Sequence, residues 1–166
     1  MSVQDTPRLL NILTAAQVPF IVIGGVAAIA HGASTVTRDL DVLIAFDRPT
    51  LERVLQAIAM HDPRAALDPA RRSVPTDVDA LTTFRNLYVT TTLGRLDFLG
   101  ETPIGGYAQL ASRAVTMSLA GVSVQVIALD DLIAIKRALG RPKDLLVATE
   151  LEAVRQRLAS RGDRPG

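Results

Sequence analysis

The 166-residue sequence predicts an α/β (α+β) fold, in which a small mixed β-sheet is backed by helices and followed by C-terminal helices. Short apolar runs of strand length, such as 18–23 and 39–45, alternate with segments of helical periodicity. Two further helical patterns, 131–139 and 144–158, follow the last predicted strand. Apolar residues make up 48% of the chain, which is enough to form a substantial core.

The length and composition of the chain favour one domain. We expect residues 1–166 to form a single domain, with a core at about 18–127 and a C-terminal helical part at about 129–158. The net charge of +1 creates no global field for nucleic acid, although local basic patches stay open, and aromatic residues, at 4%, are too few for base-stacking platforms. The sequence has no cysteine, which excludes disulfides and thiolate metal sites.

No part of the sequence predicts a membrane segment. The longest apolar run, residues 20–30, is too short to cross a bilayer. The first seven residues lack a charged leader followed by an apolar stretch. We therefore expect a soluble, cytoplasmic protein that has no membrane partner.

The first half of the chain carries clear signals for helices and strands. Thr6 and Pro7 predict the start of a helix, because a hydroxyl cap and a proline in the first turn both favour helix initiation. The elements expected next are a buried strand, a short helix, a second strand and an amphipathic helix, at 18–23, 26–31, 39–45 and 51–59. From 62 to 82 the periodicity fails and prolines mark a long connection, which we interpret as an insertion rather than a lid.

The second half of the chain predicts two hairpins and two C-terminal helices. The elements expected in order are a hairpin, a short helix, a second hairpin and two helices, at 83–99, 105–110, 115–127, 131–139 and 144–158. The hairpins are expected to turn near Gly94 and Gly121. Asp130 is expected to cap the helix at 131–139, and Gly140 to end it.

Three aspartates within apolar strand-like runs indicate a metal site. Asp39 and Asp41 project from the same face of a strand, with Cα atoms roughly 6.6 Å apart. Asp97, between two apolar residues of a later strand, is the candidate for a third carboxylate. Carboxylates, phosphate oxygens and water are the ligands that magnesium favours. A bound divalent cation would remove the repulsion that three clustered acids otherwise suffer.

The aspartates also have simpler explanations. Asp39 and Asp41 would be ordinary strand-end acids if Arg38 or other arginines paired with them. Asp97 would be explained by a turn cap or by an ion pair with Arg95. The glycine turn before the Asp39–Asp41 pair and the apolar strand after it favour metal binding.

Gly24 and Gly25 predict a tight turn between a strand and a helix. Glycine lets the backbone turn sharply and approach a ligand closely, and the helix that follows directs free N–H groups toward a phosphate. The spacing is neither that of the dinucleotide-binding glycine motif nor that of the Walker loop. Thr37 either donates a hydrogen bond to phosphate or simply suits a strand.

Basic residues near the C-terminal helices are candidates for contacts with a triphosphate. Lys136 and Lys143 are the only lysines in the chain. Lys136 lies beside the apolar stripe of its helix, so its ammonium would reach a cleft or its stem would merely cover the core edge. Arg141 and Lys143 flank a proline at a helix entry, and Asp144 in the first turn would complement the helix dipole.

These motifs together resemble the nucleotidyltransferase fold of the polymerase-beta superfamily. The resemblance covers about residues 18–155 and rests on the segments 24–25, 37–42 and 96–98. Within that superfamily, residues 28–44 and 131–144 are most similar to the abortive-infection (AbiEii-like) toxin branch. That branch carries a lysine, an arginine and a basic-acidic pair, which match Lys136, Arg141, Lys143 and Asp144 here. The sequence departs from the branch at Thr35, where an arginine is common, and in its shorter length.

The resemblance implies transfer of a nucleoside monophosphate from a nucleoside triphosphate (NTP) to a hydroxyl acceptor. Asp39, Asp41 and Asp97 would hold Mg2+ or Mn2+, and Asp97 would also assist deprotonation of the acceptor. Lys136 would be the fourth catalytic residue. The nucleotide-binding residues would be Gly24, Gly25, Thr37, Arg141, Lys143 and Asp144.

The acceptor and the biological role stay open. RNA, a protein side chain and a small molecule are all compatible as acceptors, and a toxin–antitoxin or phage-defence role with a cognate antitoxin follows from the resemblance alone. The alternatives are an inactive nucleotidyltransferase-like module that binds and regulates a partner, and a small-molecule nucleotidyltransferase of the antibiotic-modifying type.

Overall fold

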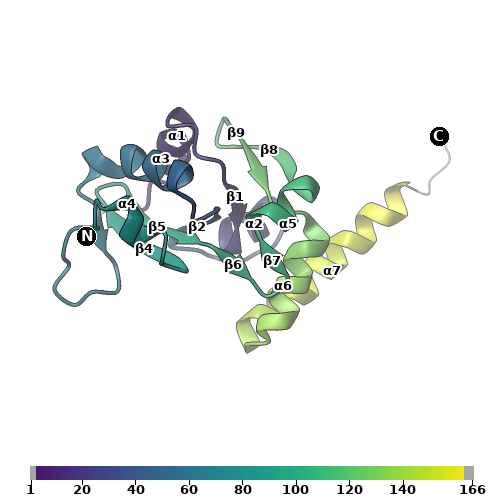
Figure 1. Ribbon diagram of the computed structural model, residues 1–166. Helices are drawn as coiled ribbons and strands as arrows, with labels where there is room; N and C mark the ends of the chain where they lie inside the picture. Colours follow the sequence, from purple (N-terminus) through teal and green to yellow (C-terminus); the bar gives the residue numbers. More distant parts are fainter. Residues whose placement is uncertain (1–2, 163–166) are drawn as a thin grey trace.

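A seven-stranded mixed β-sheet forms the centre of the computed structural model, which describes residues 3–162 (Figure 1). Its strands are β1 (Ile21–Ile23), β2 (Asp39–Leu43), β3 (Arg64–Ala65), β4 (Asn86–Thr91), β5 (Gly94–Leu99), β8 (Val115–Leu119) and β9 (Val122–Val126). Their order is β3-β4-β5-β2-β1-β9-β8. The β2–β5 and β1–β9 pairs are parallel and the other pairs are antiparallel. The predicted fold class is therefore confirmed.

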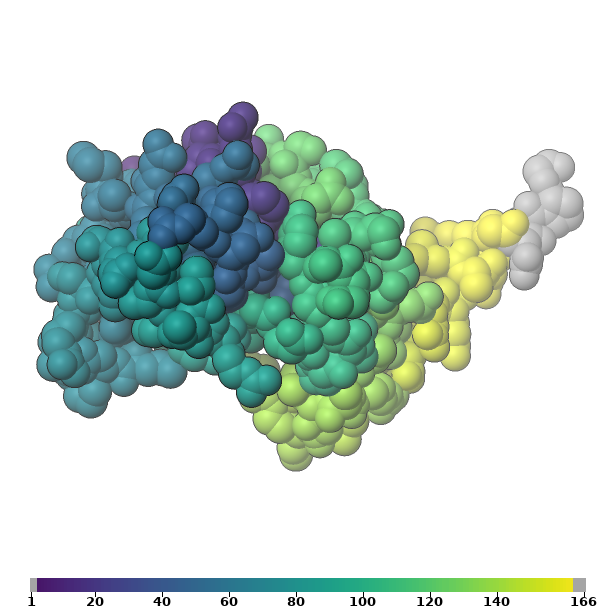
Figure 2. Space-filling model, viewed as in Figure 1, coloured from purple at the N-terminus to yellow at the C-terminus, as the bar shows by residue number. Residues whose placement is uncertain are grey.

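Helices cover the sheet from two sides. They are α1 (Thr6–Ala15), α2 (Gly24–Ala30), α3 (Arg48–Ile58), α4 (Val78–Leu81), α5 (Tyr107–Leu110), α6 (Leu129–Leu139) and α7 (Pro142–Gly162). Short 3-10 turns extend α3 and α5 at Ala59–His61 and Ala111–Arg113. In Figure 1, α1 and α3 lie above the sheet and α6 and α7 lie below it. The C-terminal end of α7 projects from the rest of the molecule (Figure 2).

Alternation along the strands separates a core face from a second, more polar face. In β2, Leu40 and Val42 are fully buried, whereas Asp39 and Asp41 are partly exposed. The same alternation places Leu96 in the core and Arg95 on the polar face of β5. Because neighbouring strands keep this phase, the polar residues of β2, β4 and β5 share one face. That face carries the candidate site.

The connection at 62–82 is more structured than the sequence predicts. It contains the two-residue strand β3 and the four-residue helix α4. A second short hairpin, formed by β6 (Glu101–Thr102) and β7 (Gly105–Gly106), precedes α5 and was not expected. Two-residue strands cannot show a sequence period, because a period needs several repeats to be recognised.

The C-terminal helices differ from the expectation at their starts. Gly140 ends α6 in the left-handed conformation, with φ 67°, as predicted. Asp130 does not cap this helix, because the cap position is Ala128 and Asp130 lies in the first turn. There Asp130 forms an ion pair with Arg155 of α7. α7 begins at Pro142, two residues earlier than expected, and no helix within residues 3–162 is long and apolar enough to cross a membrane.

Candidate active site

The parallel pairing of β2 with β5 brings three aspartates together. Asp41 lies directly opposite Asp97 in the register, and Asp39 lies two residues before Asp41 on the same face. One carboxylate oxygen from each aspartate lies within 4.8 Å of the other two. Fifty-five residues of chain separate Asp41 from Asp97, so only the strand order places them side by side.

An arginine accompanies the aspartates. Nε of Arg95 donates a hydrogen bond to Oδ1 of Asp97 at 2.9 Å. The ion pair with Arg95, which was the simpler explanation of Asp97, is therefore observed. The cluster of Asp39, Asp41 and Asp97 is observed as well. Among residues 3–162, neither Asp39 nor Asp41 forms an ion pair with Arg38, although Arg38 directly precedes their strand.

The positive charges near the three aspartates do not fully compensate the negative charges of their carboxylates. Burial, followed by the charges of Asp39 and Asp97, raises the pKa of Asp41 to about 7. Burial also raises the pKa of Asp97, against the hydrogen bond from Arg95, which lowers it. Carboxyl groups with raised pKa values favour either protonation or a bound cation.

The lack of space around positions 24 and 25 explains why both are glycines. Gly24 has φ 65°, and a Cβ there would overlap the carboxylate of Asp41. A Cβ on Gly25 would lie 2.7 Å from Cβ of Thr37. The start of α2 therefore approaches Thr37 and Asp41 as closely as it does because both glycines lack side chains. This packing role adds to the predicted contact with phosphate, which stays a prediction.

Thr37 orients one of the aspartates. Its hydroxyl lies 3.0 Å from Oδ1 of Asp39 and 3.1 Å from the carbonyl oxygen of the same residue. The hydroxyl can thus donate to the Asp39 carboxylate and fix the direction of its oxygens. The structure places Thr37 beside the cluster rather than in a plain strand, since β2 begins two residues later.

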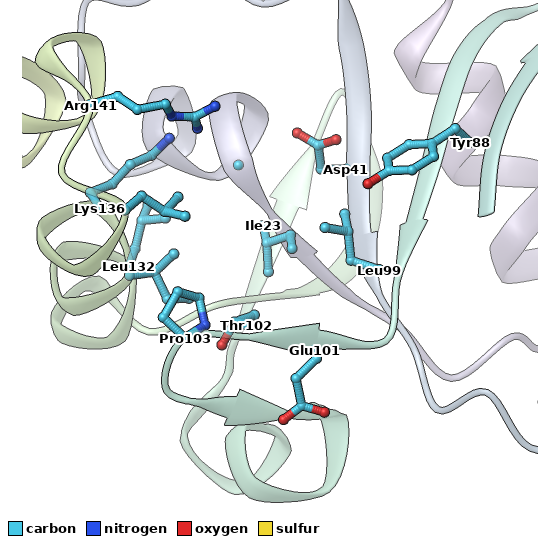
Figure 3. Close-up of a pocket in the computed structure, with 13 residues that line it drawn as sticks. Ile23, Asp41, Tyr88, Leu99, Glu101, Thr102, Pro103, Leu132, Lys136 and Arg141 are labelled. Carbon is cyan, nitrogen blue, oxygen red and sulfur yellow. The ribbon is translucent and has the colours of Figure 1, made fainter. Parts of the chain in front are cut away.

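A buried carboxylate holds two cations near the cluster. Nζ of Lys136 donates to Oδ1 of Asp144 at 3.1 Å, and Nε of Arg141 donates to its Oδ2. The Asp144 side chain is only 2% exposed. Burial by itself raises the pKa of Asp144, but the hydrogen bonds from Arg141 and Lys136 outweigh it and lower the pKa. Both cations point from the α6–α7 region toward Asp41 (Figure 3).

Two cavities meet at the cluster. The first, of about 290 Å³, is lined by every predicted site residue except Asp97, including Gly24 and Lys143. The second, of about 280 Å³, shares Asp41, Lys136 and Arg141 and has largely apolar walls (Figure 3). Asp97 lines neither cavity, but its carboxylate lies within 4.8 Å of those of Asp39 and Asp41.

Sequence reasoning did not identify Tyr88 and Glu101 as site residues. Tyr88 lies opposite Asp97 in the register of β4 and β5, and it lines the apolar cavity. The guanidinium carbon of Arg95 lies 5.9 Å from the centre of its ring. The alternation in 86–91 could have placed Tyr88 on the polar face. Glu101 belongs to the unexpected β6–β7 hairpin and had no such signal.

These features define the class of the fold, which is that of the nucleotidyltransferases. A protein of Thermotoga maritima assigned as a nucleotidyltransferase is 13% identical, with a TM-score of 0.55 over 93% of this chain and 90% of that protein. The antibiotic-resistance factor ANT(2'')-Ia is 15% identical, with a TM-score of 0.55 over 95% of this chain and 94% of that protein. No sequence family model and no curated protein sequence matches the chain. At these identities the structural likeness shows the fold alone.

Proposed function

We propose that the chain is a metal-dependent nucleotidyltransferase that moves a nucleoside monophosphate from an NTP to a hydroxyl acceptor. The observation that carries the proposal is the convergence of Asp39, Asp41 and Asp97, with carboxylate oxygens within 4.8 Å of one another. The cavity beside them is also lined by Lys136, Arg141 and Lys143. The nucleotidyltransferase fold supports the same activity.

The donor set suits a hard divalent cation. Three carboxylates with no sulfur or imidazole among them match the oxygen preference of Mg2+ or Mn2+. Asp39 and Asp41 would hold two metal ions, and Asp97 would be a further ligand of the second ion. Bound there, such ions polarise the phosphate and neutralise charge that develops on its oxygens.

The remaining residues bind and orient the reactants. The acceptor oxygen attacks the α-phosphorus, the bond to the bridging oxygen breaks, and pyrophosphate leaves. Asp97, whose pKa is raised by burial, would take up the proton of the acceptor hydroxyl. Lys136, Arg141 and Lys143 would contact the phosphates, as would backbone amides at Gly24 and Gly25. Asp144 would act as a positioning residue for Lys136 and Arg141.

A small-molecule acceptor is the second candidate. It is favoured by the likeness to ANT(2'')-Ia, an antibiotic-resistance factor, over 95% of the chain. The toxin–antitoxin or phage-defence role, the cognate antitoxin and the cytoplasmic location are hypotheses that rest on the sequence resemblance and general composition. An inactive module would keep the fold but would not turn over NTP.

Calorimetry with magnesium and each NTP separates a catalyst from an inactive scaffold. We expect binding of at least one NTP that requires the metal. Incubation with labelled NTPs and total RNA, lysate protein or small-molecule antibiotics then identifies the acceptor. Asp41→Asn should abolish labelling while the protein stays folded, and equal labelling by this variant would remove the metal assignment.

A further inference from the structure

A groove lined by arginines runs along the polar face next to the aspartates. Its volume is about 650 Å³, the largest among the cavities described above. Within the part of the chain that the structure describes, every charged residue of its lining is an arginine, namely Arg38, Arg64, Arg71 and Arg95. We call this surface the arginine groove.

The arginine groove follows a row of side chains across the sheet. Arg64 of β3 lies opposite Thr90 of β4, Thr90 opposite Arg95 of β5, and Arg95 opposite Asp39 of β2. Residues that lie opposite each other on neighbouring strands project from the same face. With strands about 4.8 Å apart, the row from Arg64 to Asp39 is about 14 Å long. It begins at the sheet edge and ends at the aspartates.

Two further arginines flank this row. Nη1 of Arg71 donates a hydrogen bond to Oγ1 of Thr90 at 3.1 Å, which holds its guanidinium over the middle of the row. Arg38 lies next to Asp39 and, among residues 3–162, has no ion pair or side-chain hydrogen bond. A smaller cavity, of about 440 Å³, contains Arg38, Asp39 and Lys143 and so connects the groove to the site.

The positive charge of the groove is only partly compensated. Arg64 pairs with Asp62 at 2.7 Å, but both side chains are exposed, so water screens the pair. Arg95 pairs with Asp97. Neither Arg38 nor Arg71 has a carboxylate partner within the described residues. The groove therefore keeps a positive field although the whole chain has a net charge of only +1.

We propose that the arginine groove binds the phosphate backbone of a nucleic-acid acceptor and leads its terminal hydroxyl to the aspartates. The inference rests on the proposed function, because it assigns the acceptor of that reaction. Guanidinium groups form paired hydrogen bonds with phosphate oxygens. At about 3.4 Å per stacked nucleotide, the row matches the length of about four nucleotides.

A nucleic-acid strand suits the groove better than an acidic polypeptide does. It supplies evenly spaced anions and a terminal hydroxyl in one molecule, as a row that ends at a transfer site requires. Among the described residues, no aromatic side chain lines the groove, and the guanidinium of Arg95 lies over the ring of Tyr88 beside it. The groove therefore offers bases no stacking platform. The contacts are therefore to the backbone rather than to the bases.

Direct binding measurements test the inference without any chemistry. Fluorescence anisotropy would follow a labelled RNA hairpin with a single-stranded 3′ end and a DNA hairpin of matched sequence, without NTP or divalent metal. We expect an affinity that falls as salt rises. Arg64→Gln combined with Arg71→Gln should weaken binding by about tenfold or more and reduce the salt slope by about 2. Preference for RNA or for DNA would identify the acceptor type.

The matched control removes the same charge elsewhere. Arg157→Gln combined with Arg161→Gln alters exposed arginines at the projecting end of α7 and should leave the affinity unchanged. Thermal melts would establish that both double variants are folded. Equal weakening by both pairs, or no binding of either hairpin, would overturn the inference. Arginine-dependent binding of polyglutamate without binding of nucleic acid would overturn it in favour of an acidic polypeptide.

Failure of this inference can be distinguished from failure of the proposed function. The Arg64 and Arg71 double variant should still bind NTP with magnesium in calorimetry. Neither residue lines the cavity of about 290 Å³ that is assigned to the phosphates. Conversely, Asp41→Asn should lose nucleotide transfer but retain nucleic-acid binding. If the unmodified protein does not bind NTP, the proposed function is contradicted. If it binds NTP but neither hairpin, only the acceptor assignment is contradicted.

Discussion

Asp41 is the residue at which the electrostatic conflict of the site is greatest. Its pKa is raised to about 7 from 3.8, first by burial and then by Asp39 and Asp97. Between these two values the folded state binds more protons than the unfolded state, so its stability falls as the pH rises. The stabilising effect of the protonated carboxyl is complete below 3.8 and is lost as the pH passes about 7.

Asp41→Asn should therefore stabilise the metal-free protein, and more so at high pH. An amide does not ionise, so the variant avoids the charge repulsion that grows through about pH 7. We expect a gain in the free energy of unfolding of about 2–4 kcal/mol at about pH 8, and little gain at about pH 4. Urea unfolding with a chelator at both pH values measures the difference. Asp79→Asn, at an exposed acid, is the control, and an equal gain at both pH values would contradict the account.

Asp144 is the second residue whose surroundings give it a clear role. Asp144→Asn would leave Lys136 and Arg141 without their shared counter-ion. Because the carboxylate is buried and charged hydrogen bonds are lost, we expect destabilisation by about 1–3 kcal/mol. The affinity for NTP should also fall, since both cations lose their orientation. Chemical unfolding and calorimetry measure the two effects, with Asp130→Asn, which loses an exposed pair with Arg155, as the control.

At the scale of elements, the β1–α2 turn sets how closely the helix approaches the aspartates. Gly24→Ala would introduce strain at φ 65° and an overlap with Asp41. Gly121→Ala is a matched control, because Gly121 has φ 82° but nothing within 4 Å of its added Cβ. We expect the control to cost about 1–2 kcal/mol. Gly24→Ala should cost more and should weaken magnesium binding, as unfolding and calorimetry would show. Equal costs would mean that the close approach is unimportant.

The elements themselves were largely predictable, with failures that have physical causes. The alternation of Asp39, Leu40, Asp41 and Val42 marks a strand with one polar face, and β2 is such a strand. Gly140 was recognisable as a helix end because glycine tolerates the left-handed conformation. The β6–β7 hairpin was missed because its stability comes from pairing, which two-residue strands do not reveal in sequence.

At the scale of the whole molecule, folding assembles the site and metal binding should stabilise the assembly. At the proposed site, Mg2+ or Mn2+ would bind only the folded state, in which the three aspartates converge, so the ion should raise the melting temperature. The rise should be larger at about pH 8 than at about pH 5, because protons compete with the metal for Asp41. Scanning fluorimetry with metal or chelator measures this. An equal rise in Asp41→Asn would place the bound metal elsewhere.

Which side chains share a face, and where the chain turns, could be predicted from the residues alone. The spacing of Asp39 and Asp41 and the two glycines that begin α2 contain that information, because these properties depend on local backbone geometry. Three features are visible only in the folded chain: Asp97 lies opposite Asp41, Asp144 holds Lys136 and Arg141, and arginines from separate segments form a groove. Strand order and helix docking depend on contacts between segments far apart in the chain, which local periodicity does not encode.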